Sequence, residues 1–261
     1  MTCDPGVDDA IALAVLAGHP DGTIDAIVAG AGNVPADVAW RNAAGIAALI
    51  GLDVPVGLGS DRAVDGSPIR RGGDVHGSDG LAGLGHRLPA PEARKDDGQP
   101  LVGGSVLAIG PLTDVARAIR AGQRVDRVVW MGGSALTEFN AAADPVAVAE
   151  VLDATTDVAA VPIETTRQVT LDDDALARWS SGSMVSRLCA ELAATRGTPP
   201  GTSPVTVHDP VAVIAALEPD LFTWSPRRLA PGARRARVAV GVDVATVRER
   251  IVDAVEAAAA T

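Results

Sequence analysis

Short runs of Val and Ile alternate with longer Ala-rich segments along most of this chain. The runs are apolar on both faces and end at Gly, Pro or Asp, as buried strands do, while the segments between them have the period of helices. We expect strands at Ile24–Val28, Val54–Val56, Ser105–Ile109, Arg127–Met131 and Asp157–Ile163, and helices at Asp9–Ala17, Ala36–Ile50, Thr113–Ala121, Pro145–Ala154 and Asp173–Thr195. This alternation predicts an α/β fold, a single open and mostly parallel sheet with helices on both faces. Ligands of such sheets bind outside the carboxyl ends of the strands, which directs attention to the residues after each strand.

Two segments do not follow the alternation. Gly57–Pro100 is rich in Gly, Asp, Arg and Pro, and Gly197–Val207 contains three prolines. Loops this long inside a compact domain usually have a function, so we expect residues 57–100 to form a lid or loop insertion beside the strand ends. No point clearly divides the 261 residues, and we expect a single domain over residues 1–261.

Composition excludes several classes of protein. The chain has 22 basic and 33 acidic side chains, two Phe, four Trp and no Tyr. It therefore lacks the clustered cations and aromatic platforms that bind nucleic acid. No apolar run reaches the roughly 18 residues that span a bilayer, and no signal peptide pattern is present, so we expect a cytoplasmic protein without membrane partners. Cys3 and Cys189 are too few for a disulfide scaffold.

Three carboxylates surround a Pro-Gly turn at the beginning of the chain, at Asp4, Asp8 and Asp9. The turn lets Asp4 and Asp9 face one point, an arrangement that suits a hard divalent cation such as Ca²⁺. Alternatively, Asp8 or Asp9 caps the helix that follows. Capping does not explain Asp4, and the spacing alone leaves both interpretations open.

The segment Asp4-Pro5-Gly6-Val7-Asp8-Asp9-Ala10 resembles the signature of the inosine-uridine-preferring nucleoside hydrolase family. Further segments follow in the family's order: Gly32-Asn33, Arg41-Asn42-Ala43, His76-Gly77, Ile109-Gly110-Pro111-Leu112-Thr113, Met131-Gly132-Gly133, Glu138-Phe139-Asn140, Asp144-Pro145 and His208-Asp209-Pro210. The resemblance covers nearly the whole chain. It implies a Rossmann-like nucleoside hydrolase fold and a homodimer or homotetramer.

The resemblance also implies an activity, the calcium-dependent hydrolysis of a ribonucleoside to ribose and free base. Asp4, Asp9, Asp209 and the backbone carbonyl of Ile109 match the positions that hold Ca²⁺. Glycoside cleavage passes through an oxocarbenium-like state and needs a nucleophile on one face and a proton donor for the leaving group. Because Ca²⁺ acidifies water only weakly, a nearby carboxylate should complete the deprotonation, and Asp4 is the candidate base.

Other matched residues are expected to bind substrate. Asp8, Asn33, Glu138 and Asn140 match positions that hold the sugar, and His76 and Met131 are placed in the substrate pocket. Asn33 and Asn140 could instead be turn-forming residues, and His76 an incidental histidine of a Gly-rich loop. His208 could protonate the departing base, or simply stand at a helix entry before Pro210. The absence of Tyr makes the chain similar to the branch of the family that uses histidines and handles inosine, uridine or cytidine.

The chain departs from the family pattern in three places. Only Met1 precedes Thr2, which stands where the family has Asp, so the first strand is expected to be missing or truncated and the true start to lie upstream. The segment Ser134–Thr137 is short and lacks a Gly-Asn that reaches the ribose, and Glu164 replaces an Asp. These departures motivate an alternative function, a catalytically impaired relative that binds calcium and ribosides as a sensor or partner subunit. A phosphohydrolase is disfavoured because the first acid of an Asp-x-Asp motif is absent.

Overall fold

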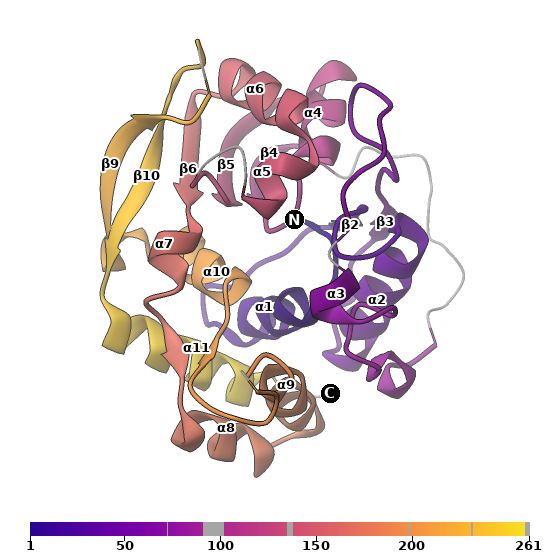
Figure 1. Ribbon diagram of the computed structural model, residues 1–261, viewed down its shortest axis with the longest axis vertical. Coiled ribbons are helices and arrows are strands. Elements are labelled where there is room, and N and C mark those ends of the chain that lie inside the picture. The colour runs from indigo at the N-terminus through magenta and orange to yellow at the C-terminus, as the bar shows by residue number, and fades with distance from the viewer. Residues whose placement is uncertain (72, 91–101, 135–137, 198, 231, 259–261) are drawn as a thin grey trace.

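The computed structural model describes residues 1–71, 73–90, 102–134, 138–197, 199–230 and 232–258. Its centre is an eight-stranded sheet in the order β3-β2-β1-β4-β5-β6-β10-β9 (Figure 1). The strands are β1 (Thr2–Cys3), β2 (Ile27–Ala29), β3 (Val56–Leu58), β4 (Gly104–Ala108), β5 (Val125–Met131), β6 (Asp157–Val161), β9 (Phe222–Arg228) and β10 (Arg235–Val242). All neighbouring strands are parallel except the antiparallel pair β9 and β10 at one edge. A separate antiparallel pair joins β7 (Thr170–Leu171) to β8 (Val205–Thr206).

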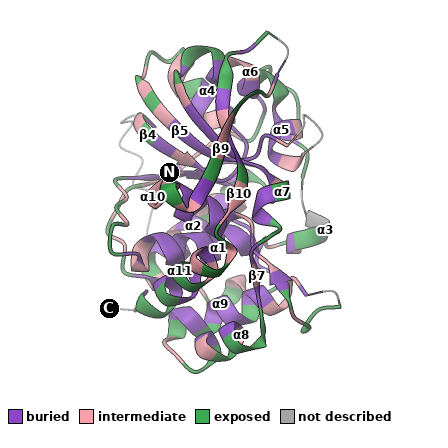
Figure 2. Cartoon of the chain, turned by 90° about the vertical axis from the view of Figure 1, so that its left-hand side faces the viewer, coloured by how far each residue is buried: buried purple, intermediate pink, exposed green. Residues whose placement is uncertain are grey.

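Helices cover both faces of the sheet, as the alternating sequence predicts (Figure 2). The helices are α1 (Val7–Gly18), α2 (Ala36–Leu49), α3 (Gly73–His76), α4 (Thr113–Arg120), α5 (Phe139–Ala143), α6 (Pro145–Ala154), α7 (Ile163–Thr166), α8 (Asp173–Ser180), α9 (Met184–Ala194), α10 (Asp209–Leu217) and α11 (Val244–Ala257), with 3-10 turns η1 (Gly85–Arg87) and η2 (Pro219–Leu221). The larger apolar core holds α1, α2, α9, α10 and α11 against one face. A second core holds α4 and α6 against the other. Among the described residues, no helix is both long and apolar enough to cross a bilayer.

The first strand is short but present, and it lies in the middle of the sheet. Thr2 and Cys3 pair in parallel with β2, and Thr2 also pairs with β4. The amides of Gly30 and Ile109 donate to the carbonyls of Cys3 and Thr2, so the two residues bind both neighbouring strands. The strand expected to be missing or truncated is therefore present as a two-residue strand, and β1 delivers Asp4 to the carboxyl edge of the sheet.

Each of the five predicted strands has a counterpart, displaced by a few residues. The strand expected at Asp157–Ile163 ends at Val161, because Pro162 precedes the short helix α7. The single helix expected over Asp173–Thr195 is wrong. The chain forms α8 and α9 instead, since Ser183 between them accepts a hydrogen bond from the Ser186 amide and caps the second helix.

The segment 57–100, expected to be a lid or insertion, contains two short helical turns in its described part. These are α3 and η1, while residues 72 and 91–100 lie outside the described residues, and the role as a lid stays a prediction. Three elements near the end of the chain, β9, β10 and α11, were not predicted from the sequence. The two strands form an edge hairpin in which charged residues such as Arg227 and Arg235 are exposed, so the apolar runs that identify buried strands are broken.

Asp144 is a buried structural carboxylate outside the cavity described below. It accepts hydrogen bonds from the Val64 amide at 2.7 Å, the Thr113 hydroxyl at 2.9 Å and the Ala147 amide at 3.0 Å. Asp144→Asn replaces one acceptor oxygen by an NH₂ group that cannot serve these donors. We expect the free energy of unfolding to fall by about 2 kcal/mol in urea denaturation. Asp153→Asn, at an exposed site on the same helix, should change it by less than about 0.5 kcal/mol, and equal losses would contradict this role of Asp144.

Candidate active site

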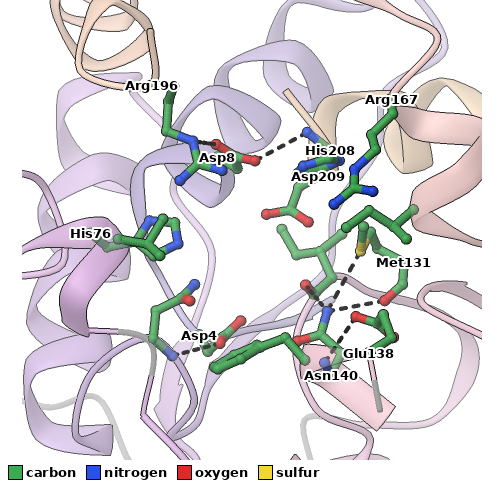
Figure 3. A pocket seen from close by; sticks show the side chains of 15 residues that line it. Asp4, Asp8, His76, Met131, Glu138, Asn140, Arg167, Arg196, His208 and Asp209 are labelled. Carbon is green, nitrogen blue, oxygen red and sulfur yellow. Dashed lines mark hydrogen bonds and ion pairs between the residues drawn. The ribbon is translucent and has the colours of Figure 1, made fainter. Parts of the chain in front are cut away.

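A cavity of about 300 Å³ opens at the carboxyl ends of the central strands (Figure 3). Asp4 follows β1, Asn33 follows β2, Ile109 follows β4 and Met131 ends β5, as expected for a ligand site in an open parallel sheet. Of the residues predicted from the sequence, the structure places Asp4, Asp8, Asn33, His76, Ile109, Met131, Glu138, Asn140, His208 and Asp209 in the wall of this cavity. Asp9 is the exception and lies behind the wall.

The Asp4 carboxylate is held tightly at the end of β1. The Asn33 amide donates to its Oδ2 at 2.8 Å, and the residue is 1% exposed. Gly32 and Gly110 approach the carboxylate so closely that a Cβ on either would collide with an oxygen. Side chains at these two positions would displace Asp4, which explains why both motif residues are glycines.

Asp9 ties the Pro-Gly turn together. One of its oxygens accepts the Asp4 amide at 3.1 Å, and the other accepts the Gly6 amide at 2.9 Å and the Asn33 side-chain amide at 3.2 Å. The hydrogen bond from the amide of Gly6, the N-cap residue, is the half of a capping box that a side chain at the third helical position supplies, since Gly6 has no side chain for the other half. Capping, one of the two interpretations left open by the spacing, is therefore correct for Asp9. Its role as a metal ligand stays a prediction.

Ionisation is unfavourable for three buried carboxyl groups of the site, those of Asp4, Asp9 and Asp209. Burial, followed by the charge of Asp9, raises the pKa of both Asp4 and Asp209 well above its usual range. Burial also raises the pKa of Asp9 to about 7, against backbone hydrogen bonds that lower it. Each of these buried carboxyl groups is therefore costly to ionise, and a bound cation would lower that cost.

Asn140 joins the ends of two strands beneath the cavity. Its Nδ2 donates to the carbonyls of Ile109 at 3.1 Å and Met131 at 3.0 Å. The backbone amide of Asn140 donates to Oε1 of Glu138 at 2.9 Å, while Oε2 of Glu138 is buried without a partner among the described atoms. Asn140 lies within helix α5, so the turn-forming alternative is wrong for it. Asn33 does occupy a bend, and it also holds Asp4 and Asp9.

The two histidines of the site are both anchored. Nδ1 of His76 accepts the Val7 amide at 3.0 Å, so the remaining proton of the neutral ring is on Nε2. Burial lowers the pKa of His76 to about 4. His208 occupies the N-cap position of α10, as the helix-entry alternative expects, and its ring also lines the cavity. Its Nδ1 lies 2.7 Å from the Thr166 hydroxyl, and burial lowers its pKa.

Sequence reasoning missed two arginines in the wall, Arg167 and Arg196. Nε of Arg196 lies 3.2 Å from Oδ1 of Asp8, and the other carboxylate oxygen of Asp8 accepts the His208 amide at 3.1 Å. Neither arginine belongs to a recognisable motif, and only the packing of α7 and of the segment after α9 brings them to the cavity.

Two of the three places where the chain departs from the family pattern lie near the site. Ser134 contacts Glu164 at 2.5 Å and accepts the Ile163 amide at 3.1 Å, while Glu164 itself does not line the cavity. The rest of the short segment, residues 135–137, lies outside the described residues.

Within the described ranges, no three His, Cys, Asp or Glu side chains converge closely enough to hold a metal ion as they stand. The donor chemistry nevertheless fits a hard cation. Asp4 and Asp209 line the cavity as buried carboxylates with raised pKa values, and Asp9 lies directly behind them. Oxygen donors of this kind are those that Ca²⁺ and Mg²⁺ select.

An open parallel sheet with buried carboxylates and two imidazoles around a small cavity defines an α/β protein that binds a small polar ligand at its strand ends. The family model described as inosine-uridine preferring nucleoside hydrolase matches residues 1–257, and the chain belongs to this family. The resemblance seen in the motifs is thereby confirmed.

Individual relatives agree with this assignment. The chain is 31% identical over 250 residues to uridine nucleosidase 1 of Arabidopsis thaliana, covering 85% of this chain and 74% of that protein. It is 29% identical over 249 residues to the non-specific ribonucleoside hydrolase RihC of Escherichia coli (strain SMS-3-5 / SECEC), covering 87% and 81%.

Solved structures confirm the fold. The plant nucleoside hydrolase PpNRh1 superimposes with a TM-score of 0.84 at 23% identity, covering 98% of both chains. The purine-preferring ribonucleoside hydrolase from Gardnerella vaginalis gives a TM-score of 0.84 at 23% identity, covering 99% of both. Neither the structure nor these relatives favour the catalytically impaired alternative.

Proposed function

We propose that this chain hydrolyses the N-glycosidic bond of ribonucleosides, releasing ribose and the free base. The observation that carries the proposal is one cavity that joins the buried carboxylate of Asp4 to the imidazole of His208 (Figure 3). Cleavage through an oxocarbenium-like state needs a base for the attacking water and an acid for the leaving group. Asp4 and His208 have the chemistry for these two tasks.

The residues between them suit the sugar. Asp8, Asn33, Glu138 and Asn140 offer carboxylate and amide groups to the ribose hydroxyls, and the unpartnered Oε2 of Glu138 is a free acceptor for one of them. In the proposed reaction, the water oxygen bonds to C1′ and loses its proton to Asp4. The bond from C1′ to the base nitrogen breaks, and the base nitrogen takes a proton from the imidazolium form of His208, which leaves the ring neutral.

We further propose Ca²⁺ as the resident ion, with Asp4, Asp9, Asp209 and the Ile109 carbonyl as ligands. When bound, the ion would lower the pKa of a coordinated water and orient the sugar. The support is the set of buried oxygen donors with raised pKa values. The family resemblance also predicts an assembly of two or four copies, which light scattering measures.

The activity is tested by offering inosine, uridine, cytidine and adenosine to the purified protein with Ca²⁺ and measuring free ribose. We expect ribose from at least one nucleoside and none after chelation with EDTA. Measurable riboside binding without ribose release from any of the four would instead support the impaired relative.

The proposed ion also has a consequence for stability. A carboxyl whose folded pKa is raised stabilises the fold below its unfolded pKa of about 4, and this contribution disappears as pH rises through the folded value. Asp9, with a pKa of about 7, follows this sign, as do Asp4 and Asp209. A bound cation competes with these protons. We therefore expect the difference in Tm between Ca²⁺ and EDTA samples to grow from pH 5 to pH 8.

Thermal unfolding at constant ionic strength measures this difference. A control is Asp114→Asn, which removes a carboxyl whose burial raises its pKa to about 6 but which lies outside the cavity wall. This variant should leave the Ca²⁺-dependent shift unchanged. A shift that shrinks as pH rises would contradict cation binding by these carboxylates.

A further inference from the structure

The backbone of His208, the proposed acid, is fixed where α10 begins. Its amide donates to Oδ2 of Asp8 at 3.1 Å, and its carbonyl accepts the Val211 amide at 3.1 Å (Figure 3). These contacts place the Cα atom but do not set the side-chain torsions that aim the ring. A general acid works only when its proton-bearing nitrogen lies within hydrogen-bond reach of the acceptor. The aim of the imidazole therefore depends on a further contact.

Among the described residues, Thr166 alone hydrogen-bonds to a nitrogen of this ring. Thr166 is the last residue of α7, and its hydroxyl lies 2.7 Å from Nδ1 of His208. The side chain is fully buried and does not line the cavity, whereas the His208 ring does. The hydroxyl therefore holds the ring from behind the wall. It leaves Nε2 as the ring nitrogen without a partner in the described part of the chain.

The hydroxyl can accept a hydrogen bond from Nδ1 because its own proton has another acceptor. Oγ1 of Thr166 lies 3.3 Å from the Ile163 carbonyl, to which it donates. A hydroxyl donates one hydrogen bond and accepts up to two. With its proton directed to Ile163, it accepts the Nδ1 proton of either the imidazolium or the neutral ring. The hydrogen bond at one ring nitrogen decides which proton the other can offer, and here that nitrogen is Nε2.

A ring released from Thr166 has a competing acceptor. Oδ1 of Asp8 is buried and, apart from its ion pair with Arg196, has no hydrogen-bond partner in the ranges that the structure describes. The other oxygen of this carboxylate already accepts the His208 amide. An imidazolium that turned toward Asp8 would gain a charge-assisted hydrogen bond and lose its aim at the departing base.

The neighbouring threonine shows what a purely structural hydroxyl does in this helix. The hydroxyl of Thr165 donates to the Ala239 carbonyl at 2.7 Å, and the residue is as buried as Thr166. Threonine hydroxyls at helix ends commonly bond to backbone carbonyls in this way. The shorter contact of Thr166 is instead with the ring of a residue that lies 42 positions away in the chain.

We infer that Thr166 is a positioning residue for the proposed acid. Its hydroxyl holds Nδ1 of His208, so that Nε2 faces the cavity and gives its proton to the departing base nitrogen. The imidazolium thereby becomes a neutral ring whose remaining proton stays on Nδ1, against Thr166. The inference rests on the proposed function and adds a residue to its mechanism.

The test is Thr166→Val, which keeps the shape of the side chain and removes the hydroxyl. For inosine and uridine, kcat should fall about 10- to 100-fold while KM changes less than about 3-fold. The rate with p-nitrophenyl riboside, whose leaving group departs without protonation, should change less than about 3-fold. Thr166→Ser keeps the hydroxyl and should restore most of the lost kcat.

Thr165→Val is the matched control, because it removes a buried hydroxyl from the same helix that does not contact His208. Both valine variants should lower Tm to a similar degree, but only Thr166→Val should slow the nucleosides more than p-nitrophenyl riboside. Equal losses on all substrates in Thr166→Val, or unchanged kinetics, would overturn the inference. So would the same selective loss in Thr165→Val.

If the wild type releases ribose from no nucleoside, the proposed function fails by itself. The contact is then tested by NMR of the ring nitrogens, where the signals of His208 among the four histidines are assigned with His208→Gln. The neutral ring should carry its proton on Nδ1 in the wild type and in Thr165→Val, and on both nitrogens in turn in Thr166→Val. The same tautomer in all three proteins would contradict the role of Thr166.

Discussion

Replacing Asp4 by Asn is expected to lower kcat/KM for ribonucleoside hydrolysis at least about 1,000-fold without unfolding the protein. The amide has the size of the carboxylate and can still accept the Asn33 amide, so the geometry between Gly32 and Gly110 is preserved. It cannot take a proton from water, and it is a poorer ligand for Ca²⁺. Steady-state ribose release and circular dichroism measure the two effects.

Stability provides an internal check on this prediction. Burial raises the pKa of Asp4, which means that its charged form is unfavourable in the folded chain. Without Ca²⁺, Asp4→Asn should therefore unfold at the same temperature as wild type or higher at pH 8. Asp114→Asn, with a buried carboxyl outside the cavity wall, should keep its activity. If the kcat/KM of Asp4→Asn stayed within about 10-fold of the wild-type value, Asp4 would not be the base.

Asn140→Leu is expected to lower both stability and activity. The substitution leaves the Ile109 and Met131 carbonyls without the donor that joins them, which should lower the free energy of unfolding by about 2–4 kcal/mol. Because Asn140 also faces the proposed sugar site, kcat/KM should fall about 100-fold or more. Urea denaturation and ribose release measure the two quantities.

Asn42 offers a matched control. Its Nδ2 also bridges two carbonyls, those of Pro5 at 3.1 Å and Asp79 at 2.8 Å, but Asn42 does not line the cavity. Asn42→Leu should cost similar stability and much less activity. If the two variants lost activity equally, the effect of Asn140 would be structural only.

Much of the site was predictable because its residues follow strands that periodicity identifies. Asp4, Asn33, Ile109 and Met131 each stand at the carboxyl end of a strand, and parallel strands bring these ends to one edge. The alternation of apolar runs and helical segments determined the layers of the fold, since each run must be covered on both faces. The break between α8 and α9 was not anticipated, because the helical period continues across a serine cap.

Other features depend on distances that no local pattern encodes. From the sequence, Asp9 was as good a candidate for a cation ligand as Asp4. Its oxygens, however, accept hydrogen bonds from amides of the turn itself and from the Asn33 side chain, and Asp9 lies behind the cavity wall. Arg167 and Arg196 reach the cavity from segments that carry no motif, since their position follows from how α7 and α9 pack on the sheet.

The sequence by itself determined the family, the layered α/β architecture and the carboxylates, amides and imidazoles at the strand ends. These depend on residue type, order and period, which are local properties of the chain. Only the tertiary structure decided which oxygens are free, which ring nitrogen of His76 carries the proton and which cations meet Asp8 and His208. Those properties arise where α1, α3, α7 and the segment after α9 meet, and contacts between distant segments are set by the packing of the whole domain.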